Sequence, residues 1–330
     1  MIGNKYKNNL HPNLIAEIAN THQGNIKYIF SLLKELKKNK IKFVKFQIYN
    51  ADELLTRDHQ RYKHFQKQSF SLKEWDKIIS YSKKFFKVCF DVFGENSLNY
   101  ILRKNIYGIK IHSSDLTNKS ILNKLTKFKN KIFISAGGSN LKEIDYAINF
   151  LKNKKPILMH GYQNYPTNID DTGLDKISFY RSIYKNKIEY GLQDHLEGDK
   201  KEASIVPLIS LAYKPSYIEK HVILKRKKTR VDSYSSLEPK EIKKLNDDII
   251  YYSKSIKFKT KLSVEENKYR KNVKKNWVAK KNIKPGDRFS LDNIEMKRVN
   301  SKNFNPFFFE ELKNQKCIKK IKKNELITKS

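Results

Sequence analysis

Two histidines near the ends of consecutive apolar runs are the residues best suited to chemistry in this sequence. His195 closes the run 188–195, and His221 lies in the run 217–224. If both runs are neighbouring strands of a parallel sheet, about 5 Å apart, their imidazoles can bind one divalent ion. Two nitrogen ligands with positions left for water and substrate suit Mn²⁺, Mg²⁺ or a similar Lewis acid. Hydrogen-bonded structural histidines are the alternative.

Two lysines are expected to point into the interior of the fold. Strand alternation around Lys45 and Lys110 directs both side chains inward, and a buried ammonium group needs an anionic partner or a depressed pKa. The partner could be a phosphate or carboxylate of a ligand, or Glu17 in an internal salt bridge. A Schiff-base lysine, as in aldolases, is a third possibility. Lys220 is a weaker Schiff-base candidate, because it should face away from the interior.

Glu17 and the segment that begins at Ser135 are further candidates. Glu17 follows an apolar run and could act as a base or support a metal, or it could form a structural pair with a lysine. Ser135, Ala136, Gly137 and Gly138 predict a tight turn from strand to helix. Their alternative role is to present backbone amides to a phosphate group.

The elements that position these residues alternate between short apolar runs and longer Lys-rich stretches of helical period. This alternation predicts repeated strand–helix units and a parallel sheet. Eight such units suggest a closed (β/α)₈ TIM barrel over residues 1–255. The predicted strands are 14–20, 43–49, 86–93, 107–113, 131–137, 156–162, 188–195 and 217–224.

Local signals support this arrangement. Ser71 with Glu74 predicts a capping box, and Asn140 with Glu143 is a similar pair. The stretch 50–70 is long for a connection in a barrel and is a candidate lid or interface.

A second, smaller domain is predicted after the barrel. Residues 256–271 are polar and Lys-rich and predict a linker. Residues 272–330 predict a compact strand-rich domain, with a turn at Pro285, Gly286 and Asp287. A domain of this size is small for independent stability, so packing against a barrel, for example that of another subunit, would help it.

The composition limits the classes of partner. The net charge of +35 in 330 residues raises the idea of a non-catalytic polyanion-binding protein, but the lysines are spread along the whole chain. We therefore expect no nucleic-acid partner and a preference for anionic small substrates. The two cysteines, Cys89 and Cys317, are far apart and suggest no disulfide framework. No apolar run is long enough for a membrane span, so we expect a cytoplasmic protein.

The motifs taken together resemble the sialic acid synthase family, the phosphoenolpyruvate-dependent synthases of nonulosonic acids. The pieces occur in the family's order over nearly the whole barrel, and the tail, with AKKNIKPGD and MKRV, is similar to the family's antifreeze-like (SAF) domain. The matching pieces are IAEIANTHQGN (15–25), VKFQ (44–47), IKIHSSD (109–115), ISAGG (134–138), NYPT (164–167), GLQDH (191–195), IEKH (218–221) and VDSYSSLEP (231–239).

The resemblance implies a role for each matching residue. It implies condensation of phosphoenolpyruvate with an N-acylated amino sugar, in a domain-swapped homodimer, for surface glycan biosynthesis. His195 and His221 would hold the metal, normally Mn²⁺, with Mg²⁺ or Co²⁺ as alternatives. Phosphoenolpyruvate would contact Lys45, Lys110, Ser113 and Ser135; the catalytic carboxylates would be Glu17 and Asp115; the sugar would contact Gln47, Tyr165, Asp232 and, from the partner's small domain, Arg298.

Some positions depart from the family pattern inside the expected pocket. The usual Gly-Ser-Gly-Glu is replaced by His112, Ser113, Ser114 and Asp115. The other departures are Gln163 for asparagine, Gln193 for serine and Asp91 for a small threonine-like residue. The departures affect the expected sugar and phosphoenolpyruvate contacts, whereas the histidine pair and the lysines are kept.

Overall fold

The chain forms two compact units, Met1–Lys257 and Phe258–Ser330, in a computed structural model. The structure describes residues 11–227, 229–256, 260–300, 308–313 and 315–328. Each unit has its own buried core.

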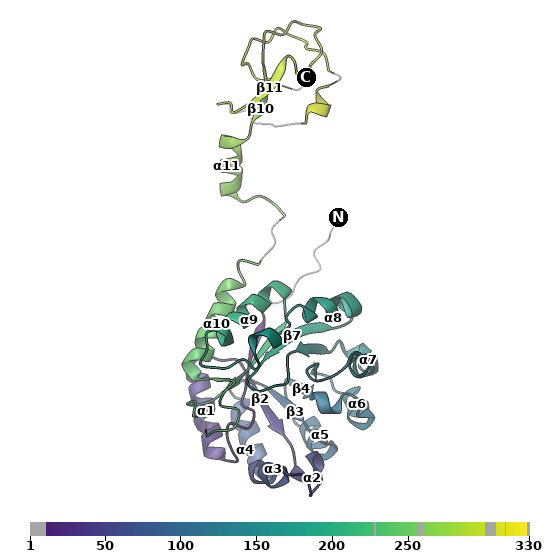
Figure 1. Cartoon of the computed structure of the whole chain (residues 1–330), viewed down its shortest axis with the longest axis vertical. Coiled ribbons are helices and arrows are strands. Elements are labelled where there is room, and N and C mark those ends of the chain that lie inside the picture. The colour runs from purple at the N-terminus through teal and green to yellow at the C-terminus, as the bar shows by residue number, and fades with distance from the viewer. Residues whose placement is uncertain (1–10, 228, 257–259, 301–307, 314, 329–330) are drawn as a thin grey trace. The chain divides into compact units, whose positions relative to one another are not determined.

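The first unit is a closed barrel of parallel strands surrounded by helices (Figure 1). Successive strands pair with one another, and β1 also pairs with β8, which closes the barrel. The predicted TIM barrel is therefore confirmed, although all eight predicted strands extend beyond the observed carboxyl ends. The barrel strands are β1 Asn13–Glu17, β2 Phe43–Ile48, β3 Lys87–Val92, β4 Gly108–Ile111, β5 Lys131–Ser135, β6 Ile157–His160, β7 Glu189–Asp194 and β8 Tyr217–Val222.

The side chains inside the barrel form an apolar layer and a polar layer. Alternate residues of each strand point inward, as the pleat of a strand requires. The apolar residues contact one another and fill the amino-terminal end of the barrel; they are Ile15, Phe43, Cys89, Phe133, Ile157, Met159 and Tyr217. Two residues further along several of these strands stand the buried polar residues Glu17, Lys45, Asp91, Ser135 and Glu219. The apolar layer thus supports a polar layer nearer the carboxyl ends of the strands, where barrel enzymes have their active sites.

Helices cover the outside of the barrel because each buries an apolar stripe against the outward-facing strand residues. The predicted caps are confirmed: Ser71 with Glu74 and Asn140 with Glu143 form capping boxes at the starts of α4 and α7. The helices are α1 Ile26–Lys38, α4 Leu72–Ser82, α5 Glu95–Leu102, α6 Lys119–Leu125, α7 Leu141–Phe150, α8 Lys176–Tyr184, α9 Glu202–Ile209 and α10 Pro239–Tyr252. Short 3₁₀ turns are Ser113–Asp115, Lys152–Lys154, Ile169–Asp171, Lys185–Lys187 and Ser210–Tyr213.

Two features of the barrel were not predicted. The long connection after β2 contains two short helices, α2 Ala51–Leu54 and α3 Tyr62–Gln68. A short strand, β9 Ser236–Leu237, pairs in parallel with the end of β8, so that Ser236 stands opposite His221. A two-residue strand is too short to produce a periodic signal in a sequence.

The second unit is small and rich in extended structure. An antiparallel pair, β10 Asn276–Ala279 and β11 Ile294–Lys297, is extended by isolated bridges such as Ile283 with Ile321. The expected turn is present, with Gly286 at a φ of 91°, a conformation that glycine adopts without strain. A 3₁₀ turn, Phe309–Glu311, precedes Leu312 in the core.

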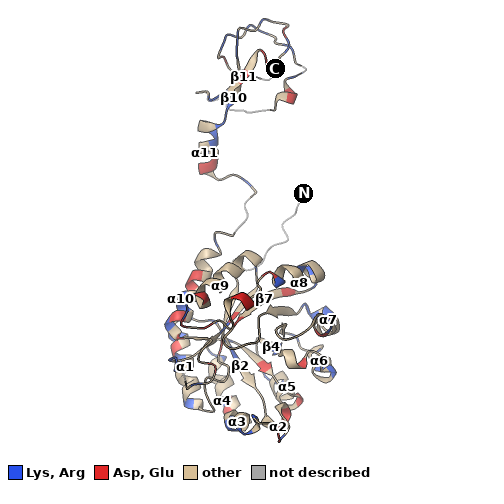
Figure 2. Cartoon of the chain, viewed as in Figure 1, with Lys and Arg blue, Asp and Glu red and all other residues tan. Residues whose placement is uncertain are grey.

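The segment predicted as a linker, 256–271, contains most of a helix, α11 Val264–Val273, which the sequence did not predict. The helix has no buried residue, which explains why its sequence has no apolar period. Basic and acidic residues occur together on α10 and α11 (Figure 2). Within the described part of the chain, no helix is long and apolar enough to cross a membrane.

Candidate active site

A buried lysine is surrounded by three carboxylates in the polar layer of the barrel. The ammonium nitrogen of Lys45 lies 2.7 Å from Glu17, 2.6 Å from Asp91 and 2.9 Å from Glu219. These four side chains come from β2, β1, β3 and β8, and each is at most 3% exposed. The salt bridge between Lys45 and Glu17, one of the three alternatives for the buried lysines, is therefore present within a larger cluster.

Lys110 belongs to the same cluster through Glu219. The Lys110 ammonium nitrogen lies 2.7 Å from Glu219 Oε1, the oxygen that also contacts Lys45. Burial opposes the charge on Lys110, but the charges of Asp91 and Glu219 outweigh it and raise the pKa of Lys110. Burial lowers the pKa of Lys45. A protonated Lys110 is a good anion ligand and a poor amine nucleophile, which argues against Schiff-base chemistry at this residue.

Lys220 lies on the other face of β8, as expected. Its ammonium group is fully buried and pairs with Asp194 and with the carbonyl oxygen of Leu196 at 3.1 Å. It therefore joins β8 to β7 outside the barrel interior and takes no part in the cluster around Lys45.

The two histidines lie side by side at the ends of β7 and β8. Their ring centroids are 5.1 Å apart, and both side chains are buried. Glu17 stands opposite His221 in the register of β1 with β8, and opposite Lys45 in the register of β1 with β2. The pair is therefore next to the lysine–carboxylate cluster, and Glu17 lies between them.

Both histidines fit the role of metal ligands. His195 Nδ1 lies 2.9 Å from the carbonyl oxygen of Tyr162, and His221 Nδ1 is buried without a hydrogen-bond partner in the described part of the chain. Burial lowers the pKa of His195 to about 4 and that of His221 well below its usual value, so both rings are neutral. Neutral imidazoles are the form that binds metals.

The pair does not form a complete metal site by itself. Among the residues described, no group of three or more His, Cys, Asp or Glu side chains is arranged to hold an ion. Two protein ligands leave coordination positions for water and substrate, which is the arrangement of a catalytic and not a structural metal.

Tyr165 covers the histidine pair and links it to Ser135. Its ring lies 4.4 Å from that of His195 and 5.8 Å from that of His221, centroid to centroid. Its hydroxyl donates to the side chain of Gln163, whose amide donates to Ser135 Oγ at 3.2 Å. The structure thus brings together the predicted residues Tyr165, Ser135 and the histidines.

The two glutamines that depart from the family pattern meet at Ser135. Gln193 Nε2 donates to Ser135 Oγ at 2.8 Å, beside the bond from Gln163. A glycine makes room for this arrangement, because a Cβ on Gly161 would lie 2.1 Å from the carbonyl oxygen of Gln193. Since Ser135 Oγ accepts two bonds, its own proton is free to donate to a ligand.

Gln47 and Asp232 are connected through Asn20. Asn20 donates from its side chain to Gln47 at 3.1 Å and from its backbone to Asp232 at 2.9 Å. Tyr49 donates to Asn20 Oδ1 at 2.6 Å, and burial raises the pKa of Asp232. These predicted sugar-binding residues therefore form one network at the ends of β1 and β2.

Three predicted residues stand apart from these groups. Ser113 and Asp115 lie in the 3₁₀ turn after β4, and the Asp115 carboxylate accepts hydrogen bonds from its neighbours Ser114 and Asn118, both at 3.0 Å. Arg298 lies in the second unit, just after β11, with an exposed side chain. The roles of Ser113, Asp115 and Arg298 stay predictions.

The predicted site omitted Glu219 and Asp91. Both are buried and contact Lys45. Alternation with His221 indicated that Glu219 points inward, and this signal could have placed it in the site. Asp91 was noted only as a departure from the family pattern, yet a carboxylate in an apolar strand is itself a signal of an internal ionic partner.

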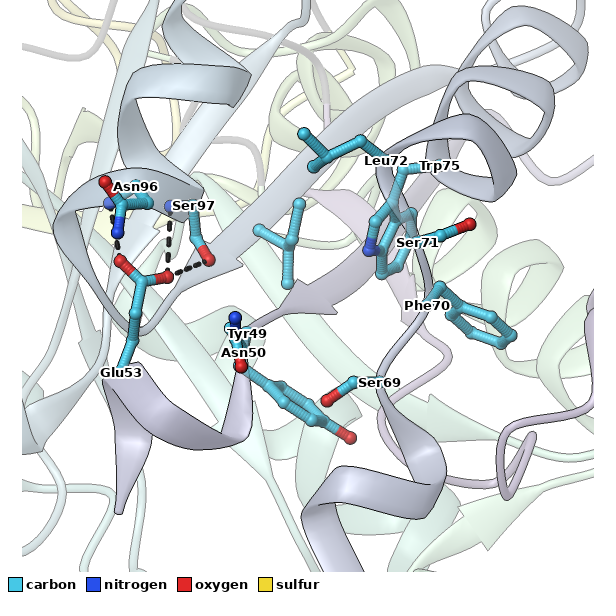
Figure 3. Close-up of a pocket in the computed structure, with 11 residues that line it drawn as sticks. Tyr49, Asn50, Glu53, Ser69, Phe70, Ser71, Leu72, Trp75, Asn96 and Ser97 are labelled. Carbon is cyan, nitrogen blue, oxygen red and sulfur yellow. Dashed lines mark hydrogen bonds between the residues drawn. The ribbon is translucent and has the colours of Figure 1, made fainter. Parts of the chain in front are cut away.

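A pocket of about 380 Å³ lies beside the long connection after β2 (Figure 3). None of the predicted site residues lines it. Glu53 there accepts hydrogen bonds from the backbone of Asn96, at 2.6 Å, and from the side chain of Ser97, at 2.7 Å, which caps the start of α5. Its hydrogen bonds serve to hold α2 against α5.

The fold and this site define a barrel enzyme with a buried ionic cluster and a histidine pair at the carboxyl ends of its strands. The chain belongs to the NeuB family, whose model matches residues 32–261, and the SAF domain model matches residues 278–330. The resemblance found in the sequence is thereby confirmed.

The curated relatives include synthases of nonulosonic acids. An uncharacterized protein of Methanocaldococcus jannaschii is 30% identical, covering 96% of this chain and 94% of that protein. The N,N'-diacetyllegionaminic acid synthase of Campylobacter jejuni is 29% identical, covering 95% and 98%. A pseudaminic acid synthase of the same species is 26% identical, covering 94% and 93%.

Solved structures agree with the fold. The N-acetylneuraminic acid synthetase of Leptospira borgpetersenii, in complex with citrate, superposes with a TM-score of 0.72 at 27% identity, covering 80% of this chain and 93% of that one. A putative spore coat polysaccharide biosynthesis protein E of Chromobacterium violaceum has a TM-score of 0.82 at 21% identity, covering 96% and 98%.

Proposed function

We propose that this enzyme condenses phosphoenolpyruvate with an N-acylated amino sugar, giving a nonulosonic acid and phosphate. The observation that carries the proposal is the position of the neutral pair His195 and His221 directly beside the cluster of Lys45, Lys110 and their carboxylates. An electrophile held at the histidines would therefore face an anionic nucleophile held at the lysines.

In the proposed reaction, C3 of phosphoenolpyruvate forms a bond with the aldehyde carbon of the open-chain sugar. A water oxygen bonds to C2, and the bond between C2 and the phosphate oxygen breaks. Of the two protons of the water, one goes to the aldehyde oxygen and the other leaves with the phosphate. The products are the nine-carbon acid and inorganic phosphate.

Different residues of the site would bind the two substrates and the water. Lys110 and Ser135 would bind the anionic groups of phosphoenolpyruvate, as an ammonium group and a hydroxyl donor suit phosphate and carboxylate oxygens. The network of Gln47 and Asp232 would bind hydroxyl groups of the sugar, and Glu17 would orient the water. Fixing both substrates in this way supplies much of the rate enhancement of a condensation.

His195 and His221 would hold a divalent ion, which we propose to be Mn²⁺. When bound, the ion supplies Lewis-acid polarisation of the sugar aldehyde. Tyr165, which lies against both rings, would exclude water from that side of the pair.

We further propose a cytoplasmic homodimer that serves surface glycan biosynthesis. In such a dimer Arg298 of one subunit would contact the sugar bound to the other. The similarity to the legionaminic and pseudaminic acid synthases over nearly the whole chain supports this part of the proposal.

The test is a screen of N-acylated hexoses with phosphoenolpyruvate and Mn²⁺, measuring released phosphate and the mass of the product. Phosphate release that requires the sugar, phosphoenolpyruvate and the metal together is the expected result. No turnover with any sugar of the panel would contradict the proposal. Reduction with borohydride in the presence of pyruvate tests the aldolase alternative, and a pyruvate adduct on Lys110 would favour it.

A further inference from the structure

Three carboxylates surround the ammonium nitrogen of Lys45. Of its three N–H donors, one donates to Asp91 at 2.6 Å and one to Glu219 at 2.9 Å, while Glu17 Oε2 lies 2.7 Å away as an ion pair. An anion that binds to Lys45 therefore competes with these carboxylates for the ammonium group.

Asp91 is the carboxylate that the rest of the structure holds least. The second oxygen of Glu17 accepts a hydrogen bond from the backbone of Ala19 at 2.7 Å. The oxygen of Glu219 that contacts Lys45 also accepts from Lys110 at 2.7 Å. Asp91 contacts Lys45 through Oδ2 alone, and its Oδ1 has no hydrogen-bond partner among the residues described.

The charge of the cluster also singles out Asp91. Glu17, Asp91 and Glu219 contribute three carboxylates, against the two ammonium groups of Lys45 and Lys110. Before a metal ion binds, one negative charge therefore remains in a buried layer that the proposed function fills with a phosphate and a carboxylate. The charge of an ion at His195 and His221 is the same with and without Asp91, so it does not change this comparison. Like charges placed together in a low-dielectric interior repel each other strongly.

Asp91 also lies between two residues with expected substrate contacts. In the sheet register it stands opposite Gln47 on β2 and opposite Lys110 on β4. The family resemblance places a small threonine-like residue at this position. A side chain of that kind would leave one donor of Lys45 free, whereas Asp91 occupies it.

We propose that Asp91 is an internal competitor for the anion site of Lys45, a positioning residue that weakens binding of phosphoenolpyruvate. This inference rests on the proposed function and adds a determinant of substrate affinity that is particular to this chain. An anionic group of the substrate takes the place of the Asp91 carboxylate on Lys45, and the apparent affinity is reduced by the cost of that displacement.

The test compares Asp91→Asn and Asp91→Thr with the unchanged enzyme. Isothermal titration calorimetry in the presence of Mn²⁺ would measure the dissociation constants of phosphoenolpyruvate and of inorganic phosphate. We expect both variants to bind phosphoenolpyruvate about tenfold more tightly, since removing a buried negative charge beside an anion site relieves repulsion. The KM for phosphoenolpyruvate should fall in parallel, while the KM for the sugar stays the same.

A matched control is Glu189→Gln, which makes the same change of carboxylate to amide and the same change of net charge. Glu189 pairs with Lys131 at 2.7 Å, and this partly exposed pair lies at the amino-terminal ends of β7 and β5, away from the polar layer. We expect its affinity for phosphoenolpyruvate to be unchanged, so that a gain seen in it would assign the effect to net charge and overturn the inference.

The outcomes separate this inference from the proposed function. If the unchanged enzyme binds phosphoenolpyruvate and both Asp91 variants bind it equally or more weakly, Asp91 is a structural partner of Lys45 and the inference fails. If neither the unchanged enzyme nor any variant binds phosphoenolpyruvate, the proposed function fails. Thermal unfolding of each variant verifies that it is folded. If Asp91→Asn does not fold, the comparison is made with Asp91→Thr.

Discussion

His195 Nδ1 lies 2.9 Å from the carbonyl oxygen of Tyr162. A carbonyl oxygen only accepts hydrogen bonds, so the ring proton of the neutral histidine must be on Nδ1. Nε2 therefore keeps its lone pair, and this is the nitrogen available to a metal. A hydrogen bond from the second ring nitrogen to a carbonyl is how proteins fix the tautomer and the orientation of metal-binding histidines.

From this geometry we predict that His195→Ala and His221→Ala each lower the affinity for Mn²⁺ by at least about tenfold, because one of two protein ligands is lost. Calorimetric titration of Mn²⁺ measures this directly, without turnover.

The matched control for the histidine pair is His160→Ala. His160 is also buried and ends the neighbouring strand β6, but its Nε2 donates to the carbonyl oxygen of Thr172 at 2.8 Å. This bond gives His160 a structural role, and we expect the His160→Ala variant to bind Mn²⁺ with unchanged affinity. Full Mn²⁺ affinity in either His195→Ala or His221→Ala would refute the assignment of the pair.

Lys220 gives a prediction about stability. Replacing Lys220 by alanine leaves the buried carboxylate of Asp194 without its partner, and breaking a buried pair in this way costs about 3–5 kcal/mol. Lys131→Ala breaks the partly exposed pair with Glu189, for which we expect a cost of at most about 1 kcal/mol. Urea unfolding measures the free energy of unfolding of both variants. An equal decrease in the two would show that Lys220 is not a structural partner of Asp194.

The barrel was predictable because its signals are local. Each strand is an apolar run, and residues such as Lys45, Lys110 and His221 alternate with apolar neighbours, which places them on the inner face. The resemblance to the family then predicted substrate or metal contacts for several of these inward residues. The capping boxes at Ser71 and Asn140 were predictable for the same reason, since both partners lie within one turn of helix.

The partners inside the barrel were not predictable. Asp91 and Glu219 are 128 positions apart in the sequence yet contact the same ammonium group. Alternation decides which face a residue is on, but strand register and rotamers decide which residues touch. Helix α11 was missed for a different reason: it buries nothing, so its sequence carries no apolar stripe.

His22 predicts a dependence of stability on pH. Burial, with a smaller contribution from the charge of Arg230, lowers the pKa of His22 to about 4, from 6.5 in an unfolded chain. Its Nδ1 accepts a hydrogen bond from the backbone N–H of Gly24 at 3.0 Å, so protonation of Nδ1 would break this bond.

Between these two pKa values the unfolded chain binds a proton that the folded chain does not. The free energy of unfolding therefore falls as the pH is lowered from 6.5 through about 4, by up to roughly 3 kcal/mol from this residue. His22→Asn keeps an acceptor for Gly24 but cannot titrate, so urea unfolding at pH 7 and pH 4.5 should show a smaller loss of stability in the variant. An equal loss in both proteins would rule out His22 as the cause.

The exposed Arg298 gives the last prediction, which concerns the proposed dimer. If Arg298 of one subunit serves the barrel of the other, a mixed dimer of a His221→Ala chain and an Arg298→Ala chain contains one intact site. That site combines the barrel of the Arg298→Ala chain with Arg298 of the other chain. The two chains, co-expressed with different affinity tags and purified through both, should show about half the activity of the unchanged dimer. Each variant alone should be nearly inactive.

A mixed dimer of His195→Ala with His221→Ala is the control, because both of its barrels are damaged, and it should stay inactive. If Arg298 serves its own barrel instead, the His221→Ala and Arg298→Ala mixture has one defect in each site and shows no recovery.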